Sequence, residues 1–276
     1  MGFARVLILL AGAFIALDAC CAEPAKGGAE FKMAAWNVFF RNTNVAEVVE
    51  IVKEMRPDIL ALEETTPRIE RELRRDLSDL LPHQHFRTEL GSGGCGVMSR
   101  WPLSRIQYLS PTGGFRGALI GAASWAGNPG GSNEVEFAVV HLATPRVGRM
   151  KSLTSALAVF QQSGEAQSEE ILRVHSAMRR VGPAVILGDF NSFSFSSAQT
   201  FLKQELWIDS LLSADPDADR RITWKGSEAT RNIGGRIDYL FHNQRLRTLE
   251  SGVIAKGSSD HFPVWSRLQV LPASDR

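Results

Sequence analysis

The sequence predicts an α/β (α+β) protein built as a four-layer α/β/β/α sandwich, in which two mixed, mainly antiparallel sheets pack face to face. Three observations support this fold class. Strand and helix patterns alternate at the beginning of the chain, short strands between glycine-rich turns fill the middle, and further short strands follow a polar helical stretch. Strands that precede and follow interleaved helices favour two packed sheets with the helices outside.

The beginning of the chain has a β-α-β-α pattern. Residues 31–40 predict the first strand. Asn44 is followed three residues later by Glu47, a capping-box pattern that begins a helix, and apolar residues then recur at helical spacing. Residues 58–62 predict a second strand, and Thr66 followed by proline begins a second helix.

The rest of the chain is richer in strands. The middle contains short predicted strands at residues 96–99, 118–125 and 135–141, a spacing that favours antiparallel or mixed pairing. Residues 149–180 form a polar helical stretch that predicts two helices. Short strands are expected near the end of the chain, around Asp238, Val253 and Val264.

The N-terminus has the pattern of a secretory signal at residues 1–22. The apolar run at residues 6–17 is too short to span a bilayer as a helix, and small residues follow it. We therefore expect a periplasmic or secreted protein that is cleaved after Ala22. A lipoprotein signal acylated at Cys20 is the alternative, although Asp18 is atypical of such a signal.

The processed chain is expected to form one domain at residues 31–272, because no linker or repeat divides it, and we expect it to be a monomer. Only Cys95 would remain, so an internal disulfide is excluded and the core must stabilise the fold. The net charge of +1 argues against binding nucleic acid through overall charge, although a local basic groove remains possible. No stable membrane insertion is expected unless Cys20 is lipidated.

The most informative stretch is a buried strand at residues 184–187 that a glycine separates from Asp189 and Asn191. If the strand geometry continues, this spacing places both side chains on one side of the chain. A carboxylate can orient or deprotonate water while an amide holds a phosphoryl oxygen, as hydrolysis of a phosphate ester requires. An Asx turn after a buried strand is the alternative interpretation.

Four further blocks place acids, amides and histidines at the ends of predicted strands. They are Ala35-Trp36-Asn37-Val38, Pro57-Asp58-Ile59-Leu60-Ala61-Leu62-Glu63-Glu64, Arg236-Ile237-Asp238-Tyr239-Leu240-Phe241 and Ser258-Ser259-Asp260-His261-Phe262-Pro263-Val264. In this order and at these separations, the chain resembles the endonuclease/exonuclease/phosphatase superfamily of metal-dependent phosphohydrolases. The resemblance covers about residues 31–270, and it implies the same four-layer sandwich.

The resemblance implies a site for Mg²⁺ or Mn²⁺ formed by Glu64, Asn37 and Asp260. Hard cations of this kind prefer oxygen ligands and leave much of their shell to water and phosphate. Glu63 occupies the position of a glutamine in the family pattern, so either of two adjacent acids could face the metal. Phe39 replaces an acid that some relatives have, which favours one principal metal over two.

The resemblance also implies the catalytic residues. His261 would contact the attacked phosphate or activate water, with Asp238 holding its imidazole in the productive tautomer. Asp189 would orient or deprotonate the water, and Asn191 would hold the phosphoryl group. His141, at the end of its strand, would donate a proton to the leaving oxygen or bind a phosphoryl oxygen.

Arg116 is a candidate ligand for a substrate phosphate because its guanidinium has a fork of donors. No Gly-x-Ser-x-Gly nucleophile motif occurs in the chain. We therefore expect a metal-dependent phosphodiesterase, nuclease-like, acting on nucleic acid or another soluble ester outside the cytoplasm. Sphingomyelinase-like or inositol-phosphate-phosphatase-like activity is the alternative, and a catalytically silent binding module is an alternative of another class.

Overall fold

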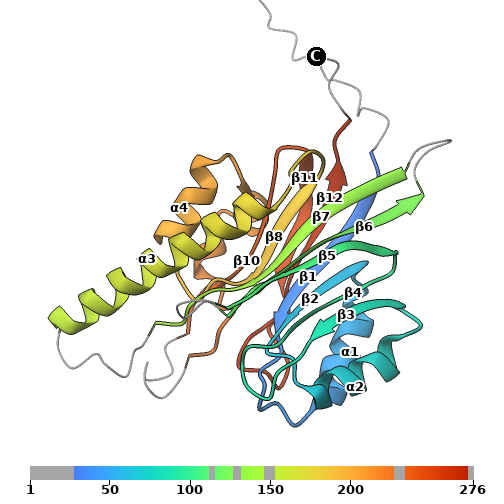
Figure 1. Ribbon diagram of the computed structural model, residues 1–276, viewed down its shortest axis with the longest axis horizontal. Helices are drawn as coiled ribbons and strands as arrows, with labels where there is room; N and C mark the ends of the chain where they lie inside the picture. Colours follow the sequence, from blue (N-terminus) through green and yellow to red (C-terminus); the bar gives the residue numbers. More distant parts are fainter. Residues whose placement is uncertain (1–27, 112–115, 127–131, 146–152, 227–233, 273–276) are drawn as a thin grey trace, which may run out of the picture.

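The computed structural model describes residues 28–111, 116–126, 132–145, 153–226 and 234–272, with two sheets packed face to face between outer helices (Figure 1). The first sheet has six strands in the order β11-β12-β1-β2-β4-β3. Their bounds are β1 Glu30–Asn37, β2 Ile59–Glu63, β3 His83–Arg87, β4 Cys95–Ser99, β11 Leu246–Val253 and β12 Val264–Val270.

The second sheet also has six strands, in the order β5-β6-β7-β8-β10-β9. Their bounds are β5 Leu103–Leu109, β6 Ala118–Ala126, β7 Ser132–His141, β8 Ala184–Asp189, β9 Ile208–Asp209 and β10 Asp238–His242. Among the described strands, only β1 with β2 and β7 with β8 pair in parallel, whereas the other pairs are antiparallel. This arrangement confirms the predicted sandwich of two mixed, mainly antiparallel sheets.

The helices cover the outer faces of the sheets (Figure 1). Their bounds are α1 Val45–Met55, α2 Pro67–Leu77, α3 Leu153–Ala177, α4 Ser197–Gln204, α5 Ser210–Ala214 and the 3₁₀ turn η2 Ala218–Arg220. The apolar stripes of α1 and α2 pack on the first sheet, and those of α3 and α4 pack on the second. None of the described helices combines the length and the apolar character needed to cross a bilayer.

The two predicted helix starts near the beginning of the chain are confirmed. The Asn44 side chain accepts a hydrogen bond from the Glu47 amide at the start of α1, and Thr66 caps α2 in the same way. The prediction of two helices within residues 149–180 is wrong, because α3 is one continuous helix. A polar stretch lacks the apolar period that would reveal a break, and α3 contains no proline to force one.

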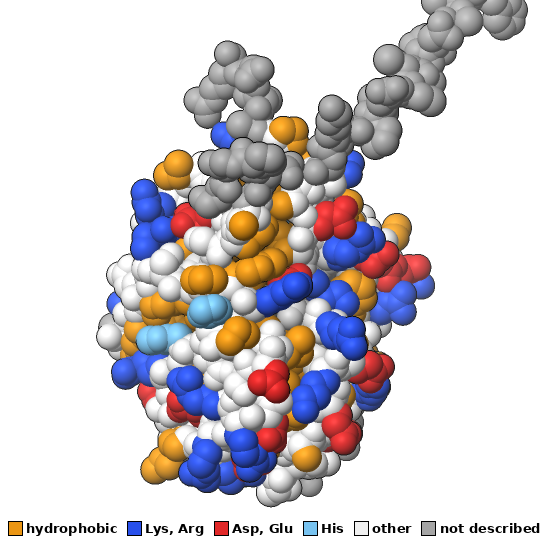
Figure 2. Space-filling model, turned by 90° about the vertical axis from the view of Figure 1, so that its right-hand side faces the viewer, with side chains coloured by type: hydrophobic (Ala, Val, Ile, Leu, Met, Phe, Trp, Pro, Cys, Tyr) orange, Lys and Arg blue, Asp and Glu red, His pale blue; other side chains and the backbone are white. Residues whose placement is uncertain are grey.

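Side chains alternate between the two faces of each strand, so every strand contributes to two apolar layers. The layer between the sheets includes Ala35, Val139, Leu187 and Leu240, all buried. Trp125 packs into this region as well, with its ring stacked on Trp101 at a centroid distance of 4.4 Å. Figure 2 shows one face of the molecule, on which acidic and basic side chains are interspersed around a band of hydrophobic ones.

Candidate active site

Four predicted site residues lie at strand ends and face the space between the sheets. Each is two positions from a residue of the inter-sheet core on the same strand, so its side chain points to the same side. They are Asn37 on β1, His141 on β7, Asp189 on β8 and Asp238 on β10. The fold therefore brings residues that are far apart in sequence to one edge of the sandwich.

Strand register aligns these residues in rows. In the second sheet, Asp189 lies opposite His141 on one side and opposite Asp238 on the other. In the first sheet, Asn37 lies opposite Glu63. The two rows meet across the gap, because the Asn37 amide Nδ2 donates a hydrogen bond of 3.1 Å to Asp189 Oδ2.

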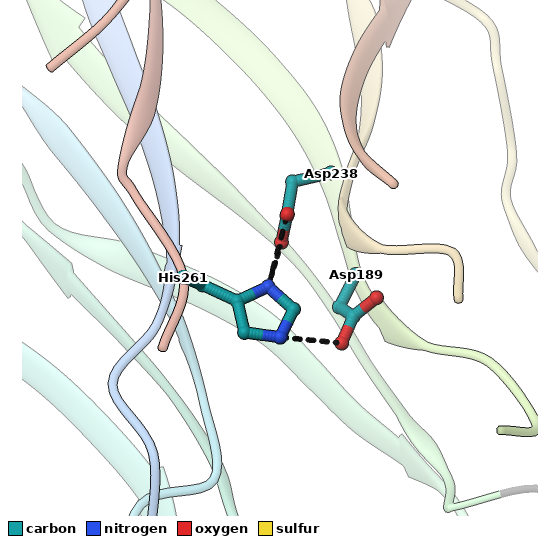
Figure 3. A group of neighbouring side chains, drawn as sticks. All are labelled: Asp189, Asp238 and His261. Atoms are coloured by element: carbon teal, nitrogen blue, oxygen red, sulfur yellow. Dashed lines mark hydrogen bonds and ion pairs between the residues drawn. The ribbon is translucent and has the colours of Figure 1, made fainter. Parts of the chain in front are cut away.

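His261 lies between two carboxylates (Figure 3). Its Nδ1 is 3.0 Å from Asp238 Oδ2, and its Nε2 is 3.7 Å from Asp189 Oδ2. Burial alone would lower the pKa of His261, but the charges of Asp238 and Asp189 outweigh it and raise the pKa. The ring is therefore held as an imidazolium, with Asp238 fixing its orientation from behind.

His141 is in a different electrostatic state. Its Nε2 lies 3.4 Å from Asp189 Oδ2 and 4.0 Å from Glu64 Oε1, yet complete burial lowers its pKa well below the usual range. The charges of Arg116 and His261 lower it further. The site thus contains one charged and one neutral imidazole on either side of Asp189, whose own pKa burial raises.

The two adjacent glutamates occupy different places. Glu63 ends β2 with its side chain in the inter-sheet space, fully buried, and both of its carboxylate oxygens lack a hydrogen-bond partner among the described residues. Burial, with the charges of Asp238 and Asp189, raises its pKa well above the usual range. Glu64 turns out of the strand at φ 59°, and its Oε2 accepts a hydrogen bond of 3.1 Å from the Phe40 amide.

The chemistry of this edge fits a divalent cation. Burial raises the pKa of Glu64, and the nearby charge of Asp260 raises it further, although hydrogen bonds from Phe40 and Asn37 oppose the shift. Asp260 Oδ1 is buried without a hydrogen-bond partner in the described part of the chain. Glu64 and Asp260 therefore repel each other where little water can screen their charges, and one of their oxygens lacks a hydrogen bond. Such a set of oxygen ligands suits Mg²⁺ or Mn²⁺.

A second acidic group is better explained by proton chemistry. Asp189, Asp238 and His261 offer ligand atoms within 4.8 Å of one another. However, His261 Nδ1 is hydrogen-bonded to Asp238 and its Nε2 faces Asp189, so the carboxylates of the group are already paired with the ring. This group is therefore suited to holding a proton or interacting with a phosphoryl charge.

Asn191 and Arg116 lie at the border of the cluster. The Asn191 amide N–H donates to Asp189 Oδ1 at 2.8 Å, and its side-chain Nδ2 donates to the Leu142 carbonyl at 3.0 Å. Arg116 hydrogen-bonds the hydroxyls of Ser92 and Thr144. Its charge lowers the pKa of His141.

Sequence reasoning missed several residues that hold this site. Ser259 Oγ donates to the Asn37 carbonyl at 2.6 Å and accepts from the His261 amide at 3.1 Å, so it ties β1 to the His261 loop. Thr223 Oγ1 accepts hydrogen bonds of 3.0 Å from the amides of Ile237 and Asp238. Ser259 belongs to a recognised block, whereas no local pattern distinguishes Thr223 from an ordinary loop hydroxyl.

Helix α3 supplies two more such residues. Gln167 is buried and its Nε2 donates to the carbonyls of Ala143 and Asn191, at 2.8 Å and 3.1 Å. Glu170 Oε2 accepts a hydrogen bond of 2.7 Å from the Ala143 amide. The segment after His141 and the turn at Asn191 are thus anchored to one helix, which the sequence shows only as polar positions in a helical stretch.

The Glu170→Gln variant should be more stable than wild type, and the difference in stability should grow as the pH rises. Burial raises the pKa of Glu170 to about 7, so its charged form is disfavoured in the folded state. Stability is then lost as the pH rises from the unfolded pKa of about 4.3 through the folded pKa. Glutamine can still accept from Ala143, and it carries no charge. We expect the variant to gain at least about 2 °C in Tm over wild type between pH 5 and pH 8, measured by circular dichroism.

Glu169→Gln is the matched control for this prediction, because Glu169 is the exposed neighbour of Glu170 on α3. Its Tm should follow that of the wild type at each pH. A Glu170→Gln effect that is the same at pH 5 and pH 8 would contradict the burial argument.

A cluster of acids, amides and histidines at the strand ends of a four-layer sandwich is the arrangement that the sequence resemblance implied. The model of the Endonuclease/Exonuclease/phosphatase family matches residues 34–261. The chain therefore belongs to this family, which confirms the resemblance drawn from its five sequence blocks and the prediction of a phosphoesterase or nuclease-like enzyme. No curated protein sequence matches the chain.

Solved structures agree with this fold. An endonuclease/exonuclease/phosphatase from Beutenbergia cavernae DSM 12333 is similar at a TM-score of 0.65 and 20% identity, covering 87% of this chain and 72% of that one. An AP endonuclease from Archaeoglobus fulgidus has a TM-score of 0.63 and 18% identity, covering 86% and 98%. TDP2 from D. rerio, complexed with single strand DNA product, has a TM-score of 0.66 and 14% identity, covering 87% and 99%.

Proposed function

We propose that this protein is a phosphodiesterase of the nuclease-like kind that depends on Mg²⁺ or Mn²⁺. One observation carries the proposal: a buried Asp189 carboxylate has Asn37, His141 and the His261–Asp238 pair around it at a single edge of the sandwich. A base, an orienting amide, a neutral imidazole and a charged one are the groups that in-line attack on a phosphate ester requires.

Each side chain has a role in this proposal. Asp189 orients the attacking water and accepts its proton. Hydrogen bonds from the side-chain amide of Asn37 and from the backbone N–H of Asn191 hold the carboxylate in place. His261 stays positively charged through Asp238 and stabilises the charge that develops on the phosphoryl oxygens. His141 is neutral, so it serves as a hydrogen-bond donor to the leaving or phosphoryl oxygen rather than as a charge.

Glu64 and Asp260 would hold the cation, with the Asn37 side chain beside them. When bound, the cation would supply neutralisation of charge on the phosphoryl and leaving oxygens. Glu63 is not assigned to the cation, because its fully buried carboxyl lies against Gly188 on the second sheet, beside the charges of Asp238 and Asp189. Arg116 would reach a substrate phosphate from the rim, where its guanidinium has donors to spare.

The proposed substrate is nucleic acid or another soluble ester, met outside the cytoplasm by a monomeric enzyme. The secretory pattern of residues 1–22 supports that location, and these residues lie outside the described part of the chain. A similar structure, TDP2 from D. rerio, is complexed with single strand DNA product. Trp125 is packed against Trp101 and Phe31, so it is not available as an aromatic membrane anchor.

The test is hydrolysis of bis-p-nitrophenyl phosphate in excess Mg²⁺, followed by a panel of DNA, RNA, sphingomyelin and inositol phosphates. We expect release of p-nitrophenol and cleavage of a nucleic acid. Cleavage of sphingomyelin or an inositol phosphate alone would replace the proposed substrate class. No turnover of any phosphate ester would overturn the proposed function and leave a silent binding module.

A further inference from the structure

Two phenylalanine rings lie on the surface in the turn that follows Asn191. Phe195 is 81% exposed and Phe193 is 38% exposed. Their rings stack with centroids 5.8 Å apart and planes inclined by 20°. The pair buries little apolar area and therefore contributes little to the core, whereas exposed apolar side chains that gather beside a polar site commonly bind a ligand.

The turn that carries these rings is held in one shape. The Ser196 amide donates to the Phe193 carbonyl at 2.9 Å. Ser194 is held from both sides, because its Oγ donates to Asp219 at 2.8 Å and its carbonyl accepts from Lys203 Nζ at 3.1 Å. A ring on a fixed turn loses little conformational freedom when a ligand stacks on it, so this pair is preorganised.

The pair flanks the proposed phosphoryl position. Phe193 is two residues from Asn191, so their Cα atoms are at most roughly 7 Å apart. The Phe193 ring also lies against Gly235, where an added Cβ would be 2.6 Å from the ring. Gly235 pairs with Trp224, and Trp224 pairs with His261. Two strand spacings therefore separate the ring contact from the His261 backbone, roughly 10 Å.

We propose that Phe193 and Phe195 form a stacking platform for a nucleobase whose phosphodiester lies at Asp189, Asn191 and His261. This inference rests on the proposed function and specifies its substrate as single-stranded nucleic acid. In a duplex both faces of each base are covered by neighbouring bases, whereas an unpaired base can stack on a fixed aromatic ring.

The composition of the turn argues against a lipid as the occupant. Serines alternate with the two rings at positions 192, 194 and 196. Ser194, between the rings, is hydrogen-bonded to the exposed side chains of Asp219 and Lys203, and insertion of the turn into a bilayer would draw these charged groups out of water, which costs free energy. A base that stacks on the exposed ring leaves Asp219 and Lys203 in water.

Two esters with the same leaving group test the platform. They are the p-nitrophenyl ester of thymidine 5′-monophosphate and methyl p-nitrophenyl phosphate. Phe195→Ala should raise KM about tenfold for the thymidine ester and leave kcat/KM for the methyl ester within about twofold. Phe195→Trp should restore the KM of the wild type, because a larger ring can stack equally well.

Leu206→Ala is the matched control, because Leu206 is also an exposed apolar residue, at 63%. This variant should leave the KM for the thymidine ester and the kcat/KM for the methyl ester unchanged. Equal losses on both esters in Phe195→Ala would show a structural role and overturn the platform, as would no change on either. A lipid occupant would be shown instead if wild type bound phosphatidylcholine vesicles, Phe195→Ala did not, and the KM for the thymidine ester was the same in both.

A binding measurement separates this inference from the proposed function. Fluorescence anisotropy with a single-stranded oligothymidine in EDTA needs no turnover, and Phe195→Ala should weaken its Kd about tenfold. If wild type hydrolyses neither ester, the proposed function fails while this measurement still decides the platform. Equal Kd values for wild type and variant would overturn the platform whether or not the enzyme is active.

Discussion

Asp189→Ala and His261→Ala should each lower turnover of a phosphodiester at least about a hundredfold, a loss of about 2.7 kcal/mol in transition-state stabilisation. In the proposed mechanism, removing Asp189 takes away the group that orients and deprotonates water. Removing His261 takes away a buried positive charge at the phosphoryl position and leaves Asp238 without its ring partner. The measurement is kcat for bis-p-nitrophenyl phosphate in saturating Mg²⁺.

Two surface substitutions of the same kinds control for this prediction. Asp217→Ala removes an exposed acid near η2, and His85→Ala removes an exposed histidine on β3. Both should keep kcat within about twofold of wild type. Circular dichroism should show that all four variants are folded. A kcat close to that of wild type in both Asp189→Ala and His261→Ala would contradict the proposed mechanism.

Removal of divalent metal should abolish activity, and Glu64→Ala should raise the Mg²⁺ concentration for half-maximal activity at least about tenfold. Glu64 is the acid that turns out of β2 towards Asn37, so its loss leaves Asp260 to hold the cation largely alone. EDTA followed by titration with Mg²⁺ or Mn²⁺ measures both effects. Binding can also be followed without turnover, because a cation that binds only the folded state raises Tm.

Glu63→Gln is the matched control and decides between the two adjacent acids. Burial raises the pKa of Glu63 well above its usual range, which favours the neutral carboxyl, and glutamine replaces that carboxyl with an amide of nearly the same shape. The Mg²⁺ dependence of this variant should stay within about twofold of wild type. If Glu63→Gln shifts the Mg²⁺ titration and Glu64→Ala does not, the assignment of the two acids is reversed.

Local patterns predicted much of the fold, because short-range signals carry their own physics. The capping residues Asn44 and Thr66 each accept a backbone hydrogen bond at a helix start, and both helices begin where expected. Strand β3 was not predicted: its sequence is His83-Gln84-His85-Phe86-Arg87, with no apolar alternation, and pairing with β4 forms it. The length of helix α3 was also not predicted, because its polar sequence has no clear apolar period.

The sequence by itself determined which residues end the strands and, through alternation, which face of each strand they share. It did not determine that Asp189 lies between His141 and Asp238, or that Asn37 reaches Asp189 from the opposite sheet. Only the tertiary structure decided these contacts, and the anchoring of Ala143 by Gln167 from α3. The physical reason is that strand register and sheet-to-sheet placement follow from packing of the whole core, whereas a local pattern specifies one segment at a time.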